Sequence, residues 1–234
     1  MEIAICDDNP IDRELMSEML KIYFDAHENM VLYTSLYSSG QELIENIEER
    51  NFDIIILDVL LGNDHGMDVA KKLRKNGYKR EIIFWSIADE HVFDAFAVDA
   101  ADYVVKKGNF GGRTNFALDK ICNKILSNSL AITYRNIVTR VYFDEIEYIE
   151  SSNTKCIIHC SRGKEYFAYR KLDEFERQLS GRHFLRCHRS YIVNMEKVKS
   201  VGSSFTMESG VQVAIKRDGI KIAKETYTKF VNKT

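Results

Sequence analysis

Short apolar runs alternate with amphipathic segments along the first half of the chain. The apolar runs, each five to seven residues long, are EIAIC, VLYTSLY, FDIIILD, EIIFWS and ADYVV. The segments that follow them have apolar residues three and four positions apart, which is typical of helices: 11–27, 40–49, 66–76, 89–98 and 109–126. Residues 54–57 lack two-residue alternation, as expected of a parallel strand covered on both faces. The pattern predicts an α/β domain of five βα units with a parallel sheet.

After a short polar connection at residues 127–130, the pattern changes to strands. The apolar positions Val141, Phe143 and 146–149 precede a turn. Residues 156–160 alternate and then turn at Arg162-Gly163 into a partner strand, which predicts a β-hairpin. One helix is expected at 171–180. Further strands are expected at 184–195, 198–201, 205–208 and 211–215. The second half is therefore predicted to be mainly β.

Length and charge agree with this division. A chain of 234 residues suits two domains, at 1–126 and 131–234. Residues 1–126 hold 14 Lys and Arg against 23 Asp and Glu, a charge of −9, whereas the remaining residues carry +7. Contact with nucleic acid phosphates requires Lys and Arg. Any nucleic acid is therefore expected to bind the second domain.

Cysteine usage and hydropathy indicate the compartment. The five cysteines are scattered and lack C-x-x-C spacing, which argues against a disulfide framework or a zinc site. The N-terminal residues show no signal-like stretch, and no apolar run approaches the roughly 20 residues that span a bilayer. The chain is expected to be cytoplasmic, with reduced thiols and no membrane contact.

Chemically specific residues follow the predicted strands of the first domain. Asp7 and Asp8 follow the first strand, Asp58 ends the third, Ser86 ends the fourth and Lys106 ends the fifth. The carboxyl ends of parallel strands meet at one edge of the sheet, so these groups converge. Clustered carboxylates repel one another unless a hard cation such as Mg²⁺ binds. A carboxylate beside a metal and a lysine can take up a phosphoryl group, and Asp58 is the central candidate.

These motifs, with Gly66-Met67 and with Tyr103 before Lys106, resemble a response regulator receiver domain, whose fold is flavodoxin-like. The resemblance implies that a sensor histidine kinase phosphorylates Asp58 and that Ser86 and Tyr103 form the switch. It also implies that Mg²⁺ is held by the following ligands: Asp7, Asp8, Asp58 and the backbone carbonyl of Leu60.

Three positions depart from the receiver pattern. Gly62 and Lys107 replace prolines that are usual in the family, and Ile87 stands where a small residue is common. The proline change puts the usual cis peptide after Lys106 in doubt. Two alternatives stay open: acidic residues that only cap strands and helices, and a degenerate receiver that works without phosphate.

The second domain carries basic residues in three places. The segment FLRCHRSYIVN alternates apolar residues with polar ones: Arg186, His188 and Ser190. Arg189 adds another donor, Lys216-Arg217 is a second basic stretch, and residues 151–155 form a polar loop. Arginine and lysine neutralise phosphates, and arginine can also read guanine.

This string, with YIESSNTKCIIH before it, resembles the LytTR-type DNA-binding domain, an elongated β sandwich found in regulators of peptide signalling and quorum sensing. The resemblance implies that three loops enter DNA grooves. Base contacts are expected from Arg189, Arg217 and the loop Asn153, Thr154, Lys155. Phosphate contacts are expected from Arg186, His188, Ser190 and Lys216. Alternatively, His188 is a hydrogen-bonded strand histidine and Arg186 pairs with a carboxylate.

Together these features favour a transcription regulator over an enzyme, because the second domain lacks a nucleophile-base or metal-ligand constellation. The expected partners are a sensor histidine kinase, double-stranded promoter DNA and, after phosphorylation, a second copy of the chain. The receiver resemblance implies a dimer surface around 89–98, the fifth strand and 109–126. Candidate contacts there are Phe93, Phe96 and Val98, and core packing is the alternative for them. The alternative is a phosphorylation-independent regulator or a protein-binding adaptor.

Overall fold

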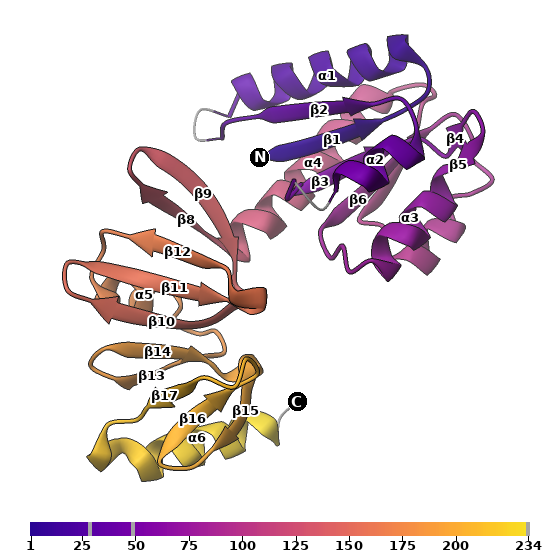
Figure 1. The fold of residues 1–234 in the computed structure, drawn as a ribbon. Helices are drawn as coiled ribbons and strands as arrows, with labels where there is room; N and C mark the ends of the chain where they lie inside the picture. The colour runs from indigo at the N-terminus through magenta and orange to yellow at the C-terminus, as the bar shows by residue number, and fades with distance from the viewer. Residues whose placement is uncertain (28–29, 48–49, 233–234) are drawn as a thin grey trace. The chain divides into compact units, whose positions relative to one another are not determined.

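The structure is a computed structural model that describes residues 1–27, 30–47 and 50–232 (Figure 1). The chain divides into two compact units, Met1–Ile125 and Leu126–Thr234. Two parts of the sequence predictions lie outside the described residues: positions 48–49 of the second helix and positions 233–234 of the second domain. No helix in the described part of the chain is long and apolar enough to cross a membrane.

A five-stranded parallel sheet forms the centre of the first unit. Its order is β2-β1-β3-β6-β7. The strands are β1 (Glu2–Cys6), β2 (Tyr33–Tyr37), β3 (Ile54–Leu57), β6 (Glu81–Ser86) and β7 (Asp102–Val105). The register pairs Cys6 with Leu57, and Leu57 with Phe84, so the strands end side by side. The predicted parallel α/β fold is confirmed, and the groups that follow these strands share one edge.

Helices pack against both faces of this sheet. They are α1 (Pro10–Asp25), α2 (Gly40–Asn46), α3 (Gly66–Lys75), the short 3-10 helix η1 (Asp94–Val98) and α4 (Phe110–Ser127). Buried residues of α2, α3 and η1 share one core with Ile55, Leu57 and Phe84. Since side chains alternate along a strand, Ile56 and Trp85 face the opposite side, where α1 and α4 contribute further buried residues. The Asn9 side chain caps α1, whose first residue is the predicted Pro10.

Three details of the first half differ from the sequence predictions. The helix expected at 89–98 is reduced to η1, because Phe93 and Phe96 are exposed and the segment has no continuous packed stripe. A hairpin of β4 (Leu60–Leu61) and β5 (Asp64–His65) follows β3. The connection expected at 127–130 is divided between α4 and a strand, because Ser129 and Leu130 are buried.

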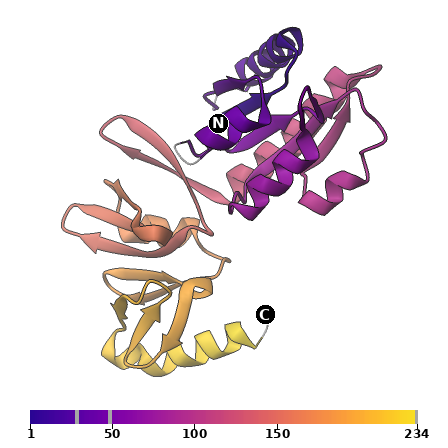
Figure 2. The same ribbon diagram turned by 45° about the vertical axis from the view of Figure 1, so that its right-hand side comes forward.

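Antiparallel strands dominate the second unit (Figure 2). A hairpin pairs β8 (Ser129–Tyr134) with β9 (Ile137–Tyr142). A five-stranded sheet has the order β12-β11-β10-β14-β13, and a three-stranded sheet the order β15-β16-β17. Their bounds are β10 (Ile146–Ser152), β11 (Lys155–Cys160), β12 (Glu165–Ala168), β13 (Phe184–His188), β14 (Tyr191–Asn194), β15 (Val198–Val201), β16 (Ser204–Met207) and β17 (Gln212–Ala214). The mainly β prediction is confirmed.

Two helices complete the cores of this unit. The predicted helix α5 (Leu172–Gln178) packs Leu172 and Phe175 on one side of the five-stranded sheet. A helix that the sequence pattern did not reveal, α6 (Ile220–Val231), packs Ala223 and Tyr227 with the three-stranded sheet. The Tyr227 hydroxyl donates to the Val198 carbonyl over 2.7 Å. Short 3-10 turns lie at Ser161–Gly163, Met195–Lys197 and Arg217–Gly219.

Candidate phosphoacceptor site and DNA interface

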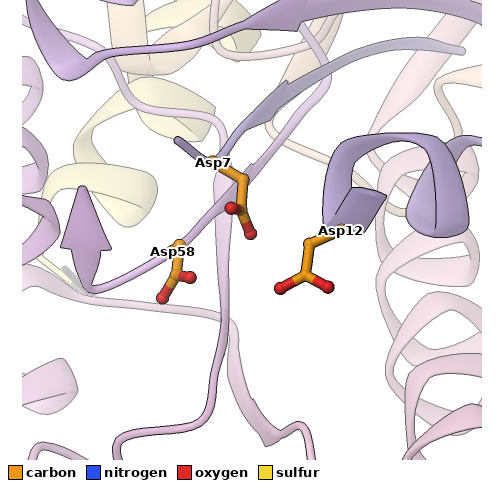
Figure 3. Close-up of side chains that lie close together, drawn as sticks. All are labelled: Asp7, Asp12 and Asp58. Carbon is orange, nitrogen blue, oxygen red and sulfur yellow. The ribbon is translucent and has the colours of Figure 1, made fainter. Parts of the chain in front are cut away.

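Three carboxylates lie close together at the carboxyl edge of the parallel sheet (Figure 3), and all three contact one lysine. Asp7 directly follows β1, Asp58 directly follows β3, and Asp12 lies in the first turn of α1. One oxygen from each carboxylate lies within 4.8 Å of the other two. Lys106 follows β7, and its side chain is only 6% exposed. Its Nζ lies 2.7 Å from an Asp7 oxygen, 2.7 Å from an Asp12 oxygen and 3.0 Å from an Asp58 oxygen.

The positive charge in this cluster does not fully offset the carboxylates. Burial raises the pKa of Asp7, although the hydrogen bond and charge of Lys106 act in the opposite direction. Burial alone would lower the pKa of Lys106, but its bonds to Asp12 and Asp7 outweigh that effect and raise it. Lys106 therefore stays protonated, while ionised Asp7 keeps a residual cost. Oxygen donors with uncompensated negative charge fit a hard divalent cation such as Mg²⁺.

Lys106 also lies against the single tryptophan of the chain. Its Nζ is 4.3 Å from the centre of the Trp85 ring, a cation-π contact. Trp85 is 2% exposed, and its indole nitrogen has no hydrogen-bond partner among the described residues. The fluorescence of Trp85 is therefore positioned to report changes in charge at this cluster.

The acidic group includes one residue that the sequence pattern did not single out and omits one that it did. Asp12 does not follow a strand directly as Asp7 and Asp8 do, yet its place two residues after Pro10 sets it in the first turn of a helix that follows β1. Asp8 is exposed and is not part of the three-carboxylate group of described residues. The N–H of Leu60 donates to Asp58 Oδ1 over 3.2 Å.

Two glycines shape the loop that follows Asp58. Gly62 has φ +61, a conformation closed to proline, so the departure from the receiver pattern follows from the β4–β5 turn. An Asp8 carboxylate oxygen would lie 3.3 Å from a Cβ placed on Gly62. At Gly66 a Cβ would stand 2.0 Å from the Asp58 backbone oxygen. The position of Gly66 eight residues after Asp58 thus reflects close backbone approach rather than a turn preference.

Ser86 and Tyr103 lie buried on neighbouring strands. The Ser86 hydroxyl accepts from the N–H of Ala88 over 3.4 Å, and the Tyr103 hydroxyl donates to the Ala88 carbonyl. Burial raises the pKa of Tyr103 to about 12, with a smaller contribution from the charge of Asp58. The phenol therefore stays protonated and holds the segment after β6.

The two remaining departures lie next to the acidic group in sequence. Lys107 pairs with Asp89 at 2.9 Å on the surface. No peptide bond between described residues is cis, including the one after Lys106. The side chain of Ile87 is exposed directly after Ser86. None of the three departures from the receiver pattern (Gly62, Lys107 and Ile87) replaces a charged group of the cluster.

In the second unit, the three basic segments lie at one end of the strands. The first is the β10–β11 turn at Asn153 and Thr154, and the second is the β13–β14 turn at Arg189 and Ser190. The Ser151 N–H donates to the Ser190 carbonyl over 2.8 Å, which joins these turns. The third begins at Lys216, whose N–H donates to the Cys187 carbonyl at the end of β13 over 2.9 Å. Figures 1 and 2 show these turns on the same side of the unit.

The side chains at this edge fall into two groups. The exposed polar residues are Asn153, Thr154, Arg189, Lys216 and Arg217. Lys216 pairs with Asp218 at 2.7 Å on the surface. Lys155 is half-buried, and its Nζ lies 4.3 Å from the centre of the Phe167 ring. The exposed group can meet a ligand without any rearrangement of the strands.

Arg186 and His188 hold the β13–β14 turn in place. Arg186 pairs with Asp173 at 3.1 Å and Glu176 at 3.0 Å, both in α5. It also donates to the backbone carbonyls of His188 and Arg189. His188 Nδ1 accepts from the Ser190 N–H over 3.2 Å. These contacts favour the alternative in which both side chains order the turn, with Arg189 at its tip.

Comparison with known proteins matches each unit to a family. Residues 3–111 match the response regulator receiver domain, and residues 137–233 match the LytTr DNA-binding domain. The response regulator TrrA of Thermotoga maritima, solved in complex with Mg²⁺-BeF, is 27% identical, covers 51% of this chain and 97% of its own, and gives a TM-score of 0.45. A LytTr DNA-binding domain from Bacillus cereus is 22% identical, covers 42% of this chain and 94% of its own, and gives a TM-score of 0.38.

Two curated relatives extend over nearly the whole chain. The transcriptional regulatory protein LytR of Staphylococcus aureus is 25% identical and covers 94% of this chain and 96% of its own length. The sensory transduction protein LytT of Bacillus subtilis is 26% identical and covers 100% and 98%. The two family models match successive parts of this chain, and the alignments with these relatives run across both parts. The chain belongs to the response regulators that join a receiver domain to a LytTr DNA-binding domain.

Proposed function

We propose that this response regulator takes up a phosphoryl group on Asp58 from a sensor histidine kinase, forms a homodimer and binds repeated sites in promoter DNA. The observation that carries the proposal is the convergence of Asp7, Asp12 and Asp58 on Lys106 at the carboxyl edge of the sheet. The basic edge of the second unit supplies the output surface.

In the proposed transfer, an Asp58 carboxylate oxygen attacks the phosphorus of a phosphohistidine. The new P–O bond forms as the P–N bond breaks, and the released imidazole takes a proton from solvent. Lys106 lies 3.0 Å from Asp58, so its ammonium offsets charge on the phosphoryl oxygens. Ser86, at the end of β6, supplies a hydroxyl for one of those oxygens.

The residues that would hold Mg²⁺ are the carboxylates of Asp7, Asp12 and Asp58, with Asp8 and the Leu60 carbonyl retained as candidates from the receiver resemblance. When bound, the ion supplies positive charge to the transferring phosphoryl group. The fit rests on the oxygen donor set and on the raised pKa of Asp7.

Dimerisation is proposed through the surface that includes η1. Phe93 and Phe96 are 82% and 77% exposed, which is unusual for phenylalanine. Val98, the third candidate from the sequence, is buried in the receiver core, because it packs beside α3. Ser86 and Tyr103 both contact Ala88, so a change at the phosphoryl group can move the segment that leads to η1.

On the DNA side, Arg189 and Arg217 are proposed as base contacts, together with the loop Asn153, Thr154, Lys155. Ser190 and Lys216 are proposed as phosphate contacts. Arg186 and His188 act by positioning Arg189.

Phosphorylation is tested by intact-protein and peptide mass spectrometry after incubation with acetyl phosphate and Mg²⁺. The expected result is one phosphoryl group on the peptide that contains Asp58, absent from Asp58→Asn and present in the control Asp68→Asn. Selection of duplexes from a random pool tests DNA binding. Arg217→Ala is expected to lose the selected duplex. A protein that takes up no phosphoryl group and selects no duplex would instead support the adaptor alternative.

A further inference from the structure

The turn between β8 and β9 carries an arginine held on an aromatic stack. Arg135 and Asn136 form this turn, with φ of +49 and +65, and both are exposed. The guanidinium carbon of Arg135 lies 5.2 Å from the centre of the Tyr134 ring. Tyr134 stacks on Tyr169, with centroids 5.3 Å apart and planes 23° apart. Stacking fixes the direction of the turn.

This aromatic stack reaches the first of the three basic turns. The Tyr134 ring lies 5.5 Å from the Phe167 ring, which in turn carries the Lys155 ammonium at 4.3 Å. Cys156 pairs with Ala168, so β11 begins where β12 ends, and Tyr169 follows at the same end. Arg135 therefore lies at the same end of the strands as Lys155. Figures 1 and 2 show the β8–β9 turn on the side of the β10–β11 turn.

The charge of this hairpin suits a polyanion. Residues 129–143 contain two arginines and no acidic residue. Among the described residues, no ion pair joins Arg135 to a carboxylate, whereas Arg186 pairs with two. The exposed neighbours of Arg135 include Asn136, the apolar Ile137 and Val138, and Tyr169, none of which is acidic. Arg135 is therefore a cation without an acidic partner among the described residues, and it lies at the same end of the strands as the three basic turns. Such a cation fits the phosphate backbone of a duplex that continues past Lys155.

We propose that the β8–β9 turn is a fourth DNA contact, in which Arg135 binds a backbone phosphate beyond the segment met by the β10–β11 turn, with the Tyr134–Tyr169 stack holding it in position. This inference rests on the proposed DNA binding. It adds a fourth turn to the three DNA-contacting loops that the LytTR resemblance implies.

Salt dependence of binding tests the contact in the full chain. The probe is a duplex of about 30 base pairs selected by the wild-type protein. Arg135→Asn removes the charge, and asparagine tolerates the left-handed turn. Loss of one phosphate contact should reduce the slope of log K against log salt by about 0.9 and weaken binding about 3- to 10-fold near 0.1 M salt. Arg135→Lys should retain the slope.

Arg162→Asn is the matched control. Arg162 is also an exposed arginine with positive φ, but it follows the far end of β11. It should leave slope and affinity unchanged. Equal effects of both substitutions would overturn the proposal, because the effect would then be one of net charge. So would an unchanged slope for Arg135→Asn while Arg217→Ala still abolishes binding. Failure of the wild-type protein to bind any duplex would overturn the proposed function itself.

A second measurement places the contact along the DNA. As the duplex is shortened from the end beside Lys155, the difference between wild type and Arg135→Asn should vanish before the effect of Arg217→Ala does. A difference that persists on the shortest bound duplex would contradict a flanking phosphate contact. A turn that binds a protein partner instead of DNA predicts no effect of Arg135→Asn on the salt slope, which is the result that overturns the proposal.

Discussion

Substitution of Lys106 by methionine should destabilise the receiver unit in a pH-dependent way. Methionine keeps much of the length of the side chain but removes the ammonium that lies within 3.0 Å of three carboxylates. Removal of one partner from a buried ion pair typically costs about 3–5 kcal/mol. Asp12 is partly exposed and can regain water, so the expected loss in unfolding free energy at neutral pH is about 3 kcal/mol.

The pH dependence has a defined sign. Lys106 supplies the two largest influences that lower the pKa of Asp7, so the substitution leaves burial to raise it further above 3.8. A group whose pKa is higher in the folded than in the unfolded state stabilises the fold fully at pH values below its unfolded pKa. This contribution is lost as the pH rises through the folded pKa. The variant should therefore recover stability as pH falls from 7 towards 4.

Urea unfolding followed by tryptophan fluorescence measures this effect in the receiver alone, because Trp85 is the only tryptophan. Lys107→Met is the control, since Lys107 pairs with Asp89 only on the surface. Its urea midpoint should match that of the wild type. A Lys106→Met midpoint equal to the wild-type value at neutral pH, or one that does not rise in acid, would refute the assignment of Lys106 as the counter-charge.

Three further substitutions test separate parts of the molecule. Gly66→Ala should abolish labelling by acetyl phosphate and lower the unfolding free energy by about 1–3 kcal/mol, because the alanine Cβ would displace the Asp58 backbone. Unchanged labelling would contradict this close approach. Arg186→Ala should weaken DNA binding without changing the salt slope, whereas a slope reduced by about 1 would make it a phosphate contact. Double substitution of Phe93 and Phe96 by serine should leave phosphorylation intact but prevent dimerisation in light scattering with beryllofluoride; a dimer that persists would place the interface elsewhere.

Sequence reasoning was most informative where local pattern and topology agree. Apolar runs without alternation identified the strands of the parallel sheet, and the rule that strand ends converge predicted that Asp7, Asp58 and Lys106 lie together. Asp12 was not predicted because it belongs to a helix rather than to a strand end. Its contribution depends on how the first turn of α1 faces β1, which the spacing alone does not fix.

Turn chemistry explains what was not predicted in the second unit. The β8–β9 hairpin turns through Arg135 and Asn136 in left-handed conformations, where a glycine is the usual signal, so its turn could not be recognised from residue type. Helix α6 was also missed, because no element was predicted after residue 215. Its lysines are exposed, and Ala223 and Tyr227 on the opposite face pack with the three-stranded sheet.

Coupling between the two units is the most direct test of the proposed regulation. The measurement is the affinity of the full chain for a selected duplex, by fluorescence anisotropy, before and after beryllofluoride and Mg²⁺ are added. Wild type should bind more tightly after the addition, and Asp58→Asn should not respond. Equal tightening of Asp58→Asn, or no change in a wild-type protein that is demonstrably loaded at Asp58, would contradict control of DNA binding by this carboxylate.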